Sequence, residues 1–540
     1  MGLSGNLAGE ERLRGATLAV GAATSGSLED GREVAEYTME WKYVVLYGYF
    51  TIVAVLAVFG AHRYHLLYLF YKYRRREPRV SGAWGELPAV TVQLPIFNEA
   101  TVVERLIEAV ARIDYPREKL EVQVLDDSTD ETCELAERKV EELRLTGLDI
   151  VYIHRTDRTG FKAGALDAGM STASGEFIAI FDADFVPEPD MLRRALDYFT
   201  DPKIGMVQTR WGHLNRDYSL LTRLQSMLLD GHFVIEHTAR NRSGRHFNFN
   251  GTAGVWRRTA IRDAGGWQHD TLTEDLDLSY RAQLEGWKFV YLLGVTAPAE
   301  LPVEMNAFKT QQHRWAKGSI QTGRKLLPRL WRSDAALKVK LEATFHLTAN
   351  CAYPMLLAMC LMMLPALNIR LAEDSSSLTS KLFDASIFVL ATISVFSFYV
   401  AAQAAIDCKW YRSLRFLPGL MALGVGLAVN NSRAVVEAAF SQESPFVRTP
   451  KYNVGNEAAG TTKKRRYRGN GHWLTWVEIG FGMYISIVMI QALSHQLWLM
   501  SAFLSIFAGG FFYVGISSLI GAKIKVRAPI LPLRVPAGVE

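Results

Sequence analysis

Residues 177–184 read Phe-Ile-Ala-Ile-Phe-Asp-Ala-Asp, five apolar residues that run directly into two carboxylates. A short apolar run of this kind is typical of a buried strand in a parallel sheet. Ligands of open α/β sheets bind beyond the carboxyl ends of the strands. The stretch therefore predicts a strand from Phe177 to Phe181 and a binding site at its end.

Three further β-rich runs precede this stretch, and amphipathic segments separate them. The strands are expected at Val90 to Leu94, Val122 to Leu125 and Ile150 to Ile153, and helices at Glu99 to Ile113 and Asp130 to Leu145. Alternating strands and helices predict a mainly parallel α/β sheet between Leu87 and about Trp331.

Polar side chains follow three of the predicted strands. They are Asn98 and Glu99 after the first, Asp126 and Asp127 after the second, and Asp182 and Asp184 after the fourth. Two carboxylates one residue apart suit a hard cation such as Mg²⁺ or Mn²⁺, which bridges the diphosphate of a nucleotide sugar and offsets the charge of the departing nucleoside diphosphate. For Asp126 and Asp127 the competing interpretation is helix capping. No GxxxxGK[ST] or GxGxxG turn follows a predicted strand.

Two more motifs of the predicted α/β part contain charged residues. Lys162 opens a helical stretch among small residues and offers a point charge, although a surface lysine is the simpler interpretation. Thr273-Glu274-Asp275 precedes the helical run Leu276 to Glu285, where acids also suit the helix dipole. An inverting sugar transfer needs a carboxylate base, and Asp275 is the leading candidate.

Gln311-Gln-His-Arg-Trp315 combines a guanidinium that suits a diphosphate with an indole that stacks on a sugar ring. A basic amphipathic stretch follows, from Lys317 to Arg332, and we expect it on the inner membrane surface.

The composition adds a membrane part. Hydrophobic residues make up 49% of the 540 residues and occur in blocks, whereas a net charge of only +5 argues against nucleic-acid binding. Five stretches are expected to cross the bilayer: Tyr43 to Ala61, Ala343 to Ile369, Ala385 to Ile406, Trp473 to Leu493 and Leu497 to Ile520. The fourth contains Glu478, which either lies near the interface or faces a polar pathway.

Basic residues after the first stretch, with acidic ones before it, place the following residues in the cytoplasm. Phe416 to Asn431 is apolar too, but as a span it would put the basic run from Lys463 to Arg468 outside. We therefore expect an interfacial helix there, with a sixth span as the alternative.

With these residues in order, the chain resembles family 2 glycosyltransferases of the cellulose synthase superfamily, and most of all their cellulose synthase-like glucan and mannan synthases. The likeness rests on five motifs that occur in the family's order: Asp126-Asp127, Lys162, Asp182-Ala-Asp184, Thr273-Glu274-Asp275 and Gln311 to Trp315.

The resemblance implies a GT-A type α/β catalytic domain, mainly parallel and cytoplasmic, inserted in an α-helical multi-pass membrane domain. It implies donor contacts for Asn98, Glu99, Asp126, Asp127, Lys162, Asp182, Gln311 and Arg314. It implies Mg²⁺ or Mn²⁺ at Asp182 and Asp184, and catalysis by Thr273, Glu274 and Asp275, with Asp275 as base.

The family also implies an acceptor site. Trp315 and the segment containing Phe249, Asn250, Gly251 and Thr252 would contact the growing chain. Phe446 to Lys451 resembles the family's F-x-V-T-x-K gating loop, in which Thr449 and Lys451 would contact the donor. Arg448 stands where the family has valine, so the details of closure differ.

The expected domains follow from these boundaries. They are a leader at 1–42, a first span at 43–71, the transferase with its interfacial helix at 87–331, spans two and three at 343–406, an interfacial helix and gating-like loop at 412–470, spans four and five at 473–520, and a cytoplasmic tail at 521–540.

The function expected is a processive inverting synthase in the inner or plasma membrane that makes a cellulose-like β-glucan from UDP-glucose and moves it across the bilayer. A (gluco)mannan synthase using GDP-mannose and a non-processive transferase acting on a lipid carrier are the enzymatic alternatives, and a nucleotide-sugar transporter or sensor is the non-enzymatic one. Expected partners are the donor, the growing polysaccharide, membrane lipid and accessory export proteins.

Overall fold

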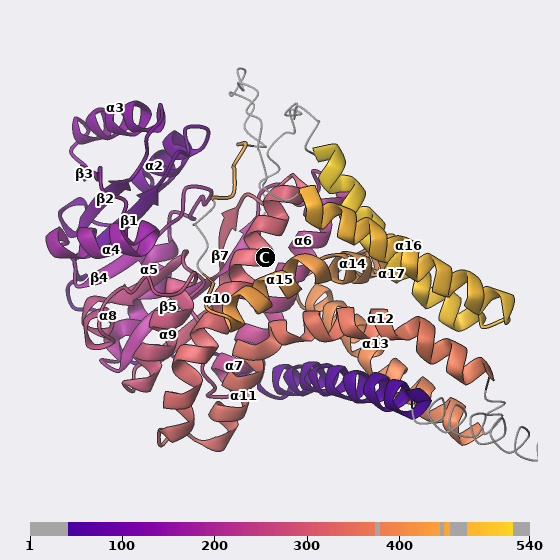
Figure 1. Ribbon diagram of the computed structural model, residues 1–540. Coiled ribbons are helices and arrows are strands. Elements are labelled where there is room, and N and C mark those ends of the chain that lie inside the picture. The colour runs from indigo at the N-terminus through magenta and orange to yellow at the C-terminus, as the bar shows by residue number, and fades with distance from the viewer. Residues whose placement is uncertain (1–40, 373–377, 443–447, 454–471, 522–540) are drawn as a thin grey trace, which may run out of the picture. The chain divides into compact units, whose positions relative to one another are not determined.

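The computed structural model describes residues 41–372, 378–442, 448–453 and 472–521 (Figure 1). The chain divides into two compact units, one formed by Met1–Val55 with Ala358–Ile387 and the other by Leu56–Leu357 with Phe388–Glu540. Almost all of the expected leader and tail, together with Phe446, Val447 and the basic run from Lys463, lie outside the described residues.

The second unit contains the predicted sheet. Its seven strands are β1 Val90–Ile96, β2 Leu120–Asp126, β3 Asp149–His154, β4 Phe177–Ile180, β5 Ile204–His213, β6 Gly254–Arg257 and β7 Lys288–Ala299. Their spatial order is β3-β2-β1-β4-β6-β5-β7. Only β6 runs antiparallel to its neighbours β4 and β5 among these strands. The four predicted strands and the mainly parallel α/β fold class are confirmed.

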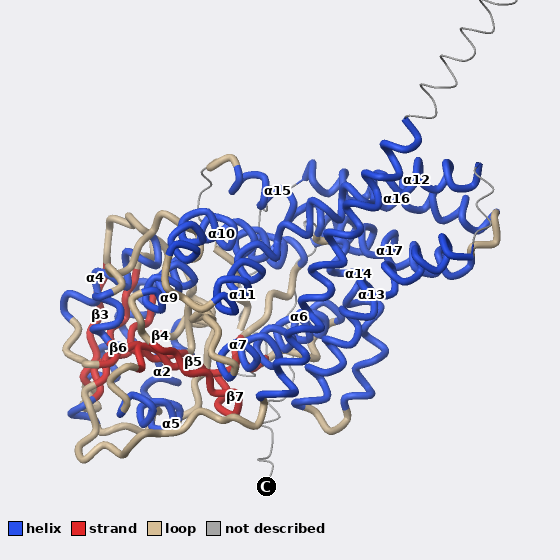
Figure 2. Tube along the Cα trace, turned by 90° about the horizontal axis from the view of Figure 1, so that it is seen from below, coloured by secondary structure: helices blue, strands red, loops and turns tan. Residues whose placement is uncertain are grey.

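Helices cover both faces of this sheet (Figure 2). On one side lie α2 Val103–Ala111, α3 Thr132–Arg144 and α5 Met191–Leu196, and on the other α4 Phe161–Thr172, α8 Arg258–Asp263 and α9 Glu274–Leu284. In β1, Val92 and Leu94 on one face and Thr91 and Gln93 on the other are all completely buried, as a strand covered on both faces requires. The first two helices begin at Val103 and Thr132, slightly later than the apolar pattern predicts.

After β5 the chain forms α6 Leu220–Asp230, a π-helix Gly231–His237 and α7 Thr238–Arg242. Short 3-10 turns occur at Arg117–Lys119, Asp197–Thr200, Ala349–Cys351 and Trp410–Phe416. The π-helix lies between the sheet and α13 Leu378–Ile406, because Gly231 approaches the Tyr399 ring so closely that a Cβ there would stand 2.6 Å from it.

The segment around Gln311 to Trp315 lies in one long helix, α10 Met305–Arg332, which begins well before the predicted amphipathic stretch. Helix α15 Ala428–Ala439 packs along it, and Glu437 of α15 contacts His313 and Lys317 at 3.1 Å each. Helix α11 Leu337–Thr348 follows α10 and leads into α12 Ala352–Ala372.

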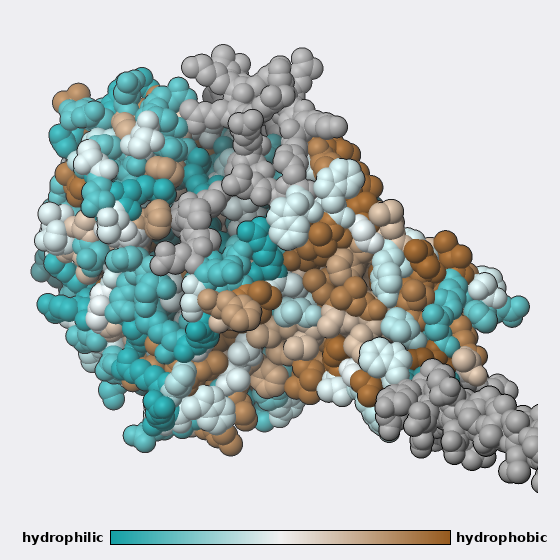
Figure 3. All heavy atoms as spheres, in the orientation of Figure 1, coloured by the Kyte–Doolittle hydropathy of each residue, from teal (hydrophilic) through white to brown (hydrophobic). Residues whose placement is uncertain are grey.

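Five described helical stretches are long and apolar enough to cross a membrane: Trp41–Tyr73, Leu337–Ala372, Trp410–Ala439, Trp473–Ser494 and Trp498–Gly521. The part of α13 whose side chains the structure describes, Thr392–Ile406, is a shorter apolar helix. Figure 3 shows the contrast on one face, where apolar residues gather over α16 His472–Ser494 and α17 Trp498–Gly521 while the α/β part is largely hydrophilic.

The stretch Trp410–Ala439 is not one straight helix. A 3-10 turn precedes α14 Leu417–Gly426, and Leu427 separates α14 from α15. Gly426 of α14 packs so tightly on Gly510 of α17 that a Cβ would lie 2.3 Å from the Gly510 carbonyl oxygen. The interfacial assignment of 416–431 stays a prediction.

Glu478 on α16 has a direct partner. Lys309 of α10 forms an ion pair with it, with an Nζ to Oε1 distance of 2.6 Å, and both side chains are buried. The buried charge of Glu478 on the apolar helix α16 is therefore matched by the charge of Lys309 on α10. This fits the alternative in which Glu478 faces a polar pathway, rather than the one in which it lies near the membrane interface.

Candidate active site

A pocket opens at the carboxyl ends of β1, β2 and β4, where the strand pattern predicts a ligand site. Helices α9 and α10 and the segment 448–453 complete its walls. Of the predicted residues, those lining it are Glu99, Asp127, Lys162, Asp182, Asp184, Asn250, Gly251, Thr273, Glu274, Asp275, Gln311, Arg314, Trp315, Thr449 and Lys451. Residues from nine separate parts of the chain thus meet at one place.

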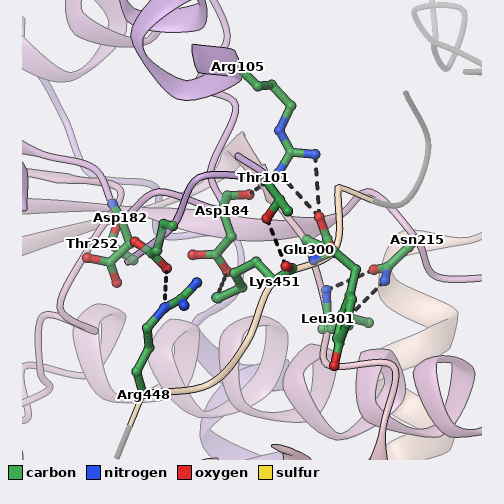
Figure 4. Close-up of polar contacts among 12 residues, drawn as sticks. Thr101, Arg105, Asp182, Asp184, Asn215, Thr252, Glu300, Leu301, Arg448 and Lys451 are labelled. Atoms are coloured by element: carbon green, nitrogen blue, oxygen red, sulfur yellow. Dashed lines mark hydrogen bonds and ion pairs between the residues drawn. The ribbon is translucent and has the colours of Figure 1, made fainter. Parts of the chain in front are cut away.

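The two carboxylates after β4 face basic partners. Lys162, in the first turn of α4, forms an ion pair with Asp182. Lys451 forms an ion pair with Asp184 (Figure 4). The backbone N–H of Asp182 donates to Thr252 Oγ1 at 2.8 Å, which fixes the turn that carries both carboxylates. Although burial favours its neutral form, Asp182 and Glu274 hold the pKa of Lys162 above its usual value.

Lys162 also donates to the carbonyl oxygen of Gly251 at 2.8 Å. Gly251 has φ +82°, and a Cβ on it would stand 3.1 Å from Asp275 Oδ2. Glycine is needed there both for the backbone angle and for the close approach to the carboxylate.

Asp275 lies in the first turn of α9, directly after Glu274. Burial, and then the adjacent Glu274 carboxylate, raise the pKa of Asp275 to about 7, against the opposing effect of Lys162. A carboxylate with a pKa near neutrality is suited to take up a proton and release it again.

Arg314 and Trp315 reach the pocket from α10. Burial lowers the pKa of the Arg314 guanidinium, while Glu274, Asp182 and Asp275 oppose that effect. The Trp315 ring lies 6.5 Å, between centroids, from Trp211 at the end of β5, so the two indoles form an aromatic wall. Such a wall suits the apolar face of a sugar.

The described part of the gating-like loop lies against the pocket. Arg448 bonds Glu99 at 3.2 Å and the carbonyl oxygen of Asn98. Thr101 donates to the Lys451 carbonyl oxygen at 2.9 Å, and the Tyr452 N–H donates to Glu300 at 2.9 Å. Burial raises the pKa of Glu99, although Arg448 and Lys451 oppose it. The arginine that departs from the family pattern therefore docks this loop on the β1 end.

Four predicted contact residues do not line the pocket. Phe249 is fully buried, its ring packed edge-on against Trp256, and Thr252 supports the turn at Asp182. Asn98, with φ +52°, bonds Ser128 and Thr129 and presents its carbonyl to Arg448. In this structure these three side chains therefore support the pocket from outside its lining.

Asp126 is the fourth predicted contact residue that does not line the pocket. Its carboxylate is completely buried and accepts from the Tyr152 hydroxyl at 2.7 Å and from the Ser128 N–H at 2.9 Å. Cys133 and His154 also bring ligand-type atoms within 4.8 Å of it. The neighbouring Asp127 does reach the pocket, held by two bonds from Arg155 of 2.8 and 2.6 Å.

Several pocket residues escaped the sequence analysis, among them Phe97, Arg158 and Trp211. Phe97 follows β1 and carries the Arg158 guanidinium 3.3 Å above its ring centroid, and Trp211 lies in the last part of β5. Phe97 could have been found, because it stands between the predicted strand and Asn98. Arg158 and Trp211 belong to no motif that we recognised.

The donor set at Asp182 and Asp184 fits a divalent cation. Both groups are oxygen ligands of the kind that Mg²⁺ and Mn²⁺ take, and they stand at the pocket wall. Each of these carboxylates forms an ion pair with a lysine, so both positions stabilise positive charge.

The chain is similar to known proteins over the part that forms the pocket. Residues 88–318 match the profile described as "Glycosyltransferase like family 2". A probable glucomannan 4-beta-mannosyltransferase 7 of Oryza sativa subsp. japonica is 42% identical over 297 residues, which are 54% of this chain and 51% of that protein. Glucomannan 4-beta-mannosyltransferase 2 of Arabidopsis thaliana is 44% identical over 254 residues, 46% of this chain and 48% of its own length. The chain thus spans about half the length of the curated relatives it matches.

Among solved structures, the chain is similar to a mannosyltransferase from Pyrobaculum calidifontis in complex with GDP-Man and Mn²⁺. That likeness has 21% identity and a TM-score of 0.46, and it covers 73% of this chain and 100% of the other.

Proposed function

We propose that the chain is a processive, inverting synthase that transfers mannose from GDP-mannose to a β-linked mannan or glucomannan, because residues 88–318 match the family model described as "Glycosyltransferase like family 2". One observation carries the proposal: Asp275, Lys162, Asp182 and Arg314 line the same pocket. Relatives 41–44% identical are described as glucomannan 4-beta-mannosyltransferases, and they favour GDP-mannose over the UDP-glucose that we expected first.

In this proposal the basic residues bind the donor. Arg314 and Lys162 stabilise the diphosphate, and Gln311 and Lys451 contact it from α10 and from the docked loop. A divalent cation held by Asp182 and Asp184 supplies charge neutralisation for the leaving nucleoside diphosphate when it is bound.

Asp275 acts as the base. Its carboxylate takes the proton from the attacking hydroxyl of the acceptor sugar while that oxygen forms the bond to the donor anomeric carbon. The bond from that carbon to the phosphate oxygen breaks on the opposite face, so an α-linked donor gives a β-linked product. Thr273 and Glu274 hold Asp275 at the start of α9.

The acceptor end of the polymer stacks on Trp315 and Trp211, next to Asn250 and Gly251. In this proposal the two indoles hold the terminal sugar of the chain while the next transfer takes place. We further propose that the pocket faces the cytoplasm and that the apolar helices pass the product outwards, with membrane lipid and accessory export proteins as partners.

The donor experiment tests this proposal. Vesicles holding the full chain are incubated with Mg²⁺ or Mn²⁺ and separately labelled GDP-mannose, UDP-glucose and UDP-N-acetylglucosamine, and any polymer is digested with linkage-specific hydrolases. We expect label from GDP-mannose in a β-mannanase-sensitive polymer. Incorporation from UDP-glucose alone, or a product of one sugar on lipid, would refute the proposal.

A further inference from the structure

Two histidines outside the pocket lining hold the side chain of Asn250, which is part of that lining. Asn250 Nδ2 lies 3.0 Å from His232 Nε2, and Asn250 Oδ1 bonds His237 Nε2. The two imidazole rings lie close together, with centroids 4.3 Å apart. Both belong to the π-helix Gly231–His237.

The π-helix explains why both rings reach the same amide. In an α-helix, residues five apart point about 140° away from each other. The i→i+5 hydrogen bonding of a π-helix instead brings such residues nearly one above the other. His232 and His237 are five apart, so the wider turn aligns them. π-helical turns are rare and often occur at functional sites.

The protons in this cluster have one consistent arrangement. Glu236 accepts from His232 Nδ1 at 2.9 Å and is also bonded by Arg240 at 3.1 Å. Arg240 and His232 outweigh the effect of burial and hold the pKa of Glu236 well below its usual value, so Glu236 is a carboxylate. His232 Nδ1 therefore donates to Glu236, and the Asn250 amide nitrogen donates to His232 Nε2.

His237 completes the arrangement from the other side. Burial, and then the neighbouring His232, hold its pKa well below the usual value, so the ring is neutral and carries a single proton. That proton on Nε2 donates to Asn250 Oδ1. If the Asn250 amide were turned over, its nitrogen would face His237 Nε2 and set two donors against each other. Its oxygen would face His232 Nε2 and set two acceptors against each other, unless a histidine changed its tautomer.

The same cluster is tied to neighbouring elements. Arg240 bonds Glu342 of α11 at 3.0 Å, and Glu342 contacts His62 of the helix Trp41–Tyr73 at 3.0 Å. The scaffold behind Asn250 is thus a connected set of buried and half-buried polar groups, and such a network is stiff because a lost bond would leave a polar group in the protein interior unpaired.

Asn250 transmits this stiffness to the pocket. Its backbone N–H donates to Gln208 Oε1 at 3.0 Å, and the next residue, Gly251, accepts from Lys162 and packs against Asp275. The position of the Asn250–Gly251 peptide therefore determines where Lys162 and Asp275 stand.

We propose that His232 and His237 are positioning residues for sugar transfer: they fix the Asn250 amide, and through the Asn250–Gly251 peptide they hold Lys162 and Asp275 in their working geometry. The inference rests on the proposed function. Neither histidine touches substrate in this account, and their effect is on the rate of the chemical step rather than on donor binding.

Two conservative substitutions separate the bonds of His232. In His232→Gln the amide reaches the place of Nε2 and can still accept from Asn250. In His232→Asn it matches Nδ1, keeps the contact with Glu236 and loses Asn250. Val234→Ala, a fully buried change in the same π-helix, serves as the control for general loosening.

Initial rates of label incorporation by the full chain in vesicles, with kcat and donor KM determined separately, test the inference. We expect kcat of His232→Asn to fall about tenfold or more, with donor KM changed less than about threefold, since misplacement of about 1 Å costs up to about a hundredfold. His232→Gln and Val234→Ala should keep at least about a third of wild-type kcat.

Equal kcat in His232→Asn and wild type would overturn the inference, as would a loss in Val234→Ala as large as in His232→Asn, or a His232→Gln variant no better than His232→Asn. A wild-type chain that transfers no sugar from any donor would instead refute the proposed function, so the two failures are distinguishable.

Discussion

Lys451, in the segment after α15, forms an ion pair with Asp184, the second carboxylate after β4. Thr101 holds the backbone of Lys451 at the same time. A divalent cation bound by Asp182 and Asp184 would bring further positive charge next to the Lys451 ammonium group. Docking of this loop and binding of a divalent cation are therefore linked through one carboxylate.

The first prediction concerns that linkage. Without donor, Lys451→Ala should bind Mn²⁺ about threefold to tenfold more tightly than wild type, because removing a competing ion-pair partner is worth about 1 kcal/mol. Mn²⁺ titration followed by electron paramagnetic resonance measures this. Lys119→Ala, which breaks an ion pair with the exposed Glu86, is the control and should change nothing. Weaker or unchanged Mn²⁺ binding in Lys451→Ala would contradict the linkage.

The second prediction is a pH dependence. The base must be deprotonated, and burial with the Glu274 charge raises the pKa of Asp275 to about 7, so the transfer rate should rise as pH increases from 6 to 8. Glu274→Gln removes the like charge and should move this rise to lower pH. The measurement is kcat against pH for both proteins. A flat profile in wild type, or a rise at the same pH in both, would argue against Asp275 as the base.

The third prediction uses a close contact between α10 and α9. A Cβ on Gly318 would stand 2.5 Å from Thr273 Oγ1, in the residue that caps α9. Gly318→Ala should therefore displace Asp275 and lower the transfer rate about tenfold to a hundredfold. Gly323→Ala, on the same helix, meets nothing closer than 3.4 Å and should leave the rate unchanged. Equal rates in both variants would show that the α9 contact does not matter.

The fourth prediction addresses stability. Lys309 and Glu478 join α10 to α16 as a buried ion pair, so Lys309→Met should destabilise the protein by about 3–5 kcal/mol because it leaves Glu478 buried and unpaired. Thermal unfolding in detergent should show most of the loss recovered in the Lys309→Met, Glu478→Met double variant. Arg329→Met, which breaks a pair with the partly exposed Glu285, should cost about 1 kcal/mol or less. A double variant no more stable than Lys309→Met would mean that the pair is not coupled.

Much of the fold could be predicted because the strands are fully buried. Phe177 to Phe181 is a continuous apolar run followed by Asp182, and Val90 to Ile96 is a β-rich run closely followed by Asn98 and Glu99. The run predicts the strand, and the polar residues after it predict the side of the sheet that binds ligand. The antiparallel strand β6 was not predicted, because its four residues Gly254 to Arg257 are too short to show a period.

The pocket could be predicted only where a motif marks it. Lys162, Asp182 and Asp275 occur in recognisable local patterns, and the structure brings them together. Arg448 stood out only as a departure from a pattern, and its contact with Glu99 is visible only in the fold. The π-helix Gly231–His237 was not predicted, because no motif that we recognised falls in it, and its contact with Tyr399, a residue far away in the chain, is visible only in the fold.

The central claim, that this pocket transfers sugar with Asp275 as base, is tested most directly by Asp275→Asn. Polymer synthesis from labelled GDP-mannose and GDP binding are measured on the same vesicles, with wild type beside the variant. The account predicts polymer in wild type, no polymer above background in Asp275→Asn, and GDP affinity within about threefold of wild type, because the change removes the base but none of the diphosphate contacts. Polymer synthesis at the wild-type rate by Asp275→Asn would contradict it.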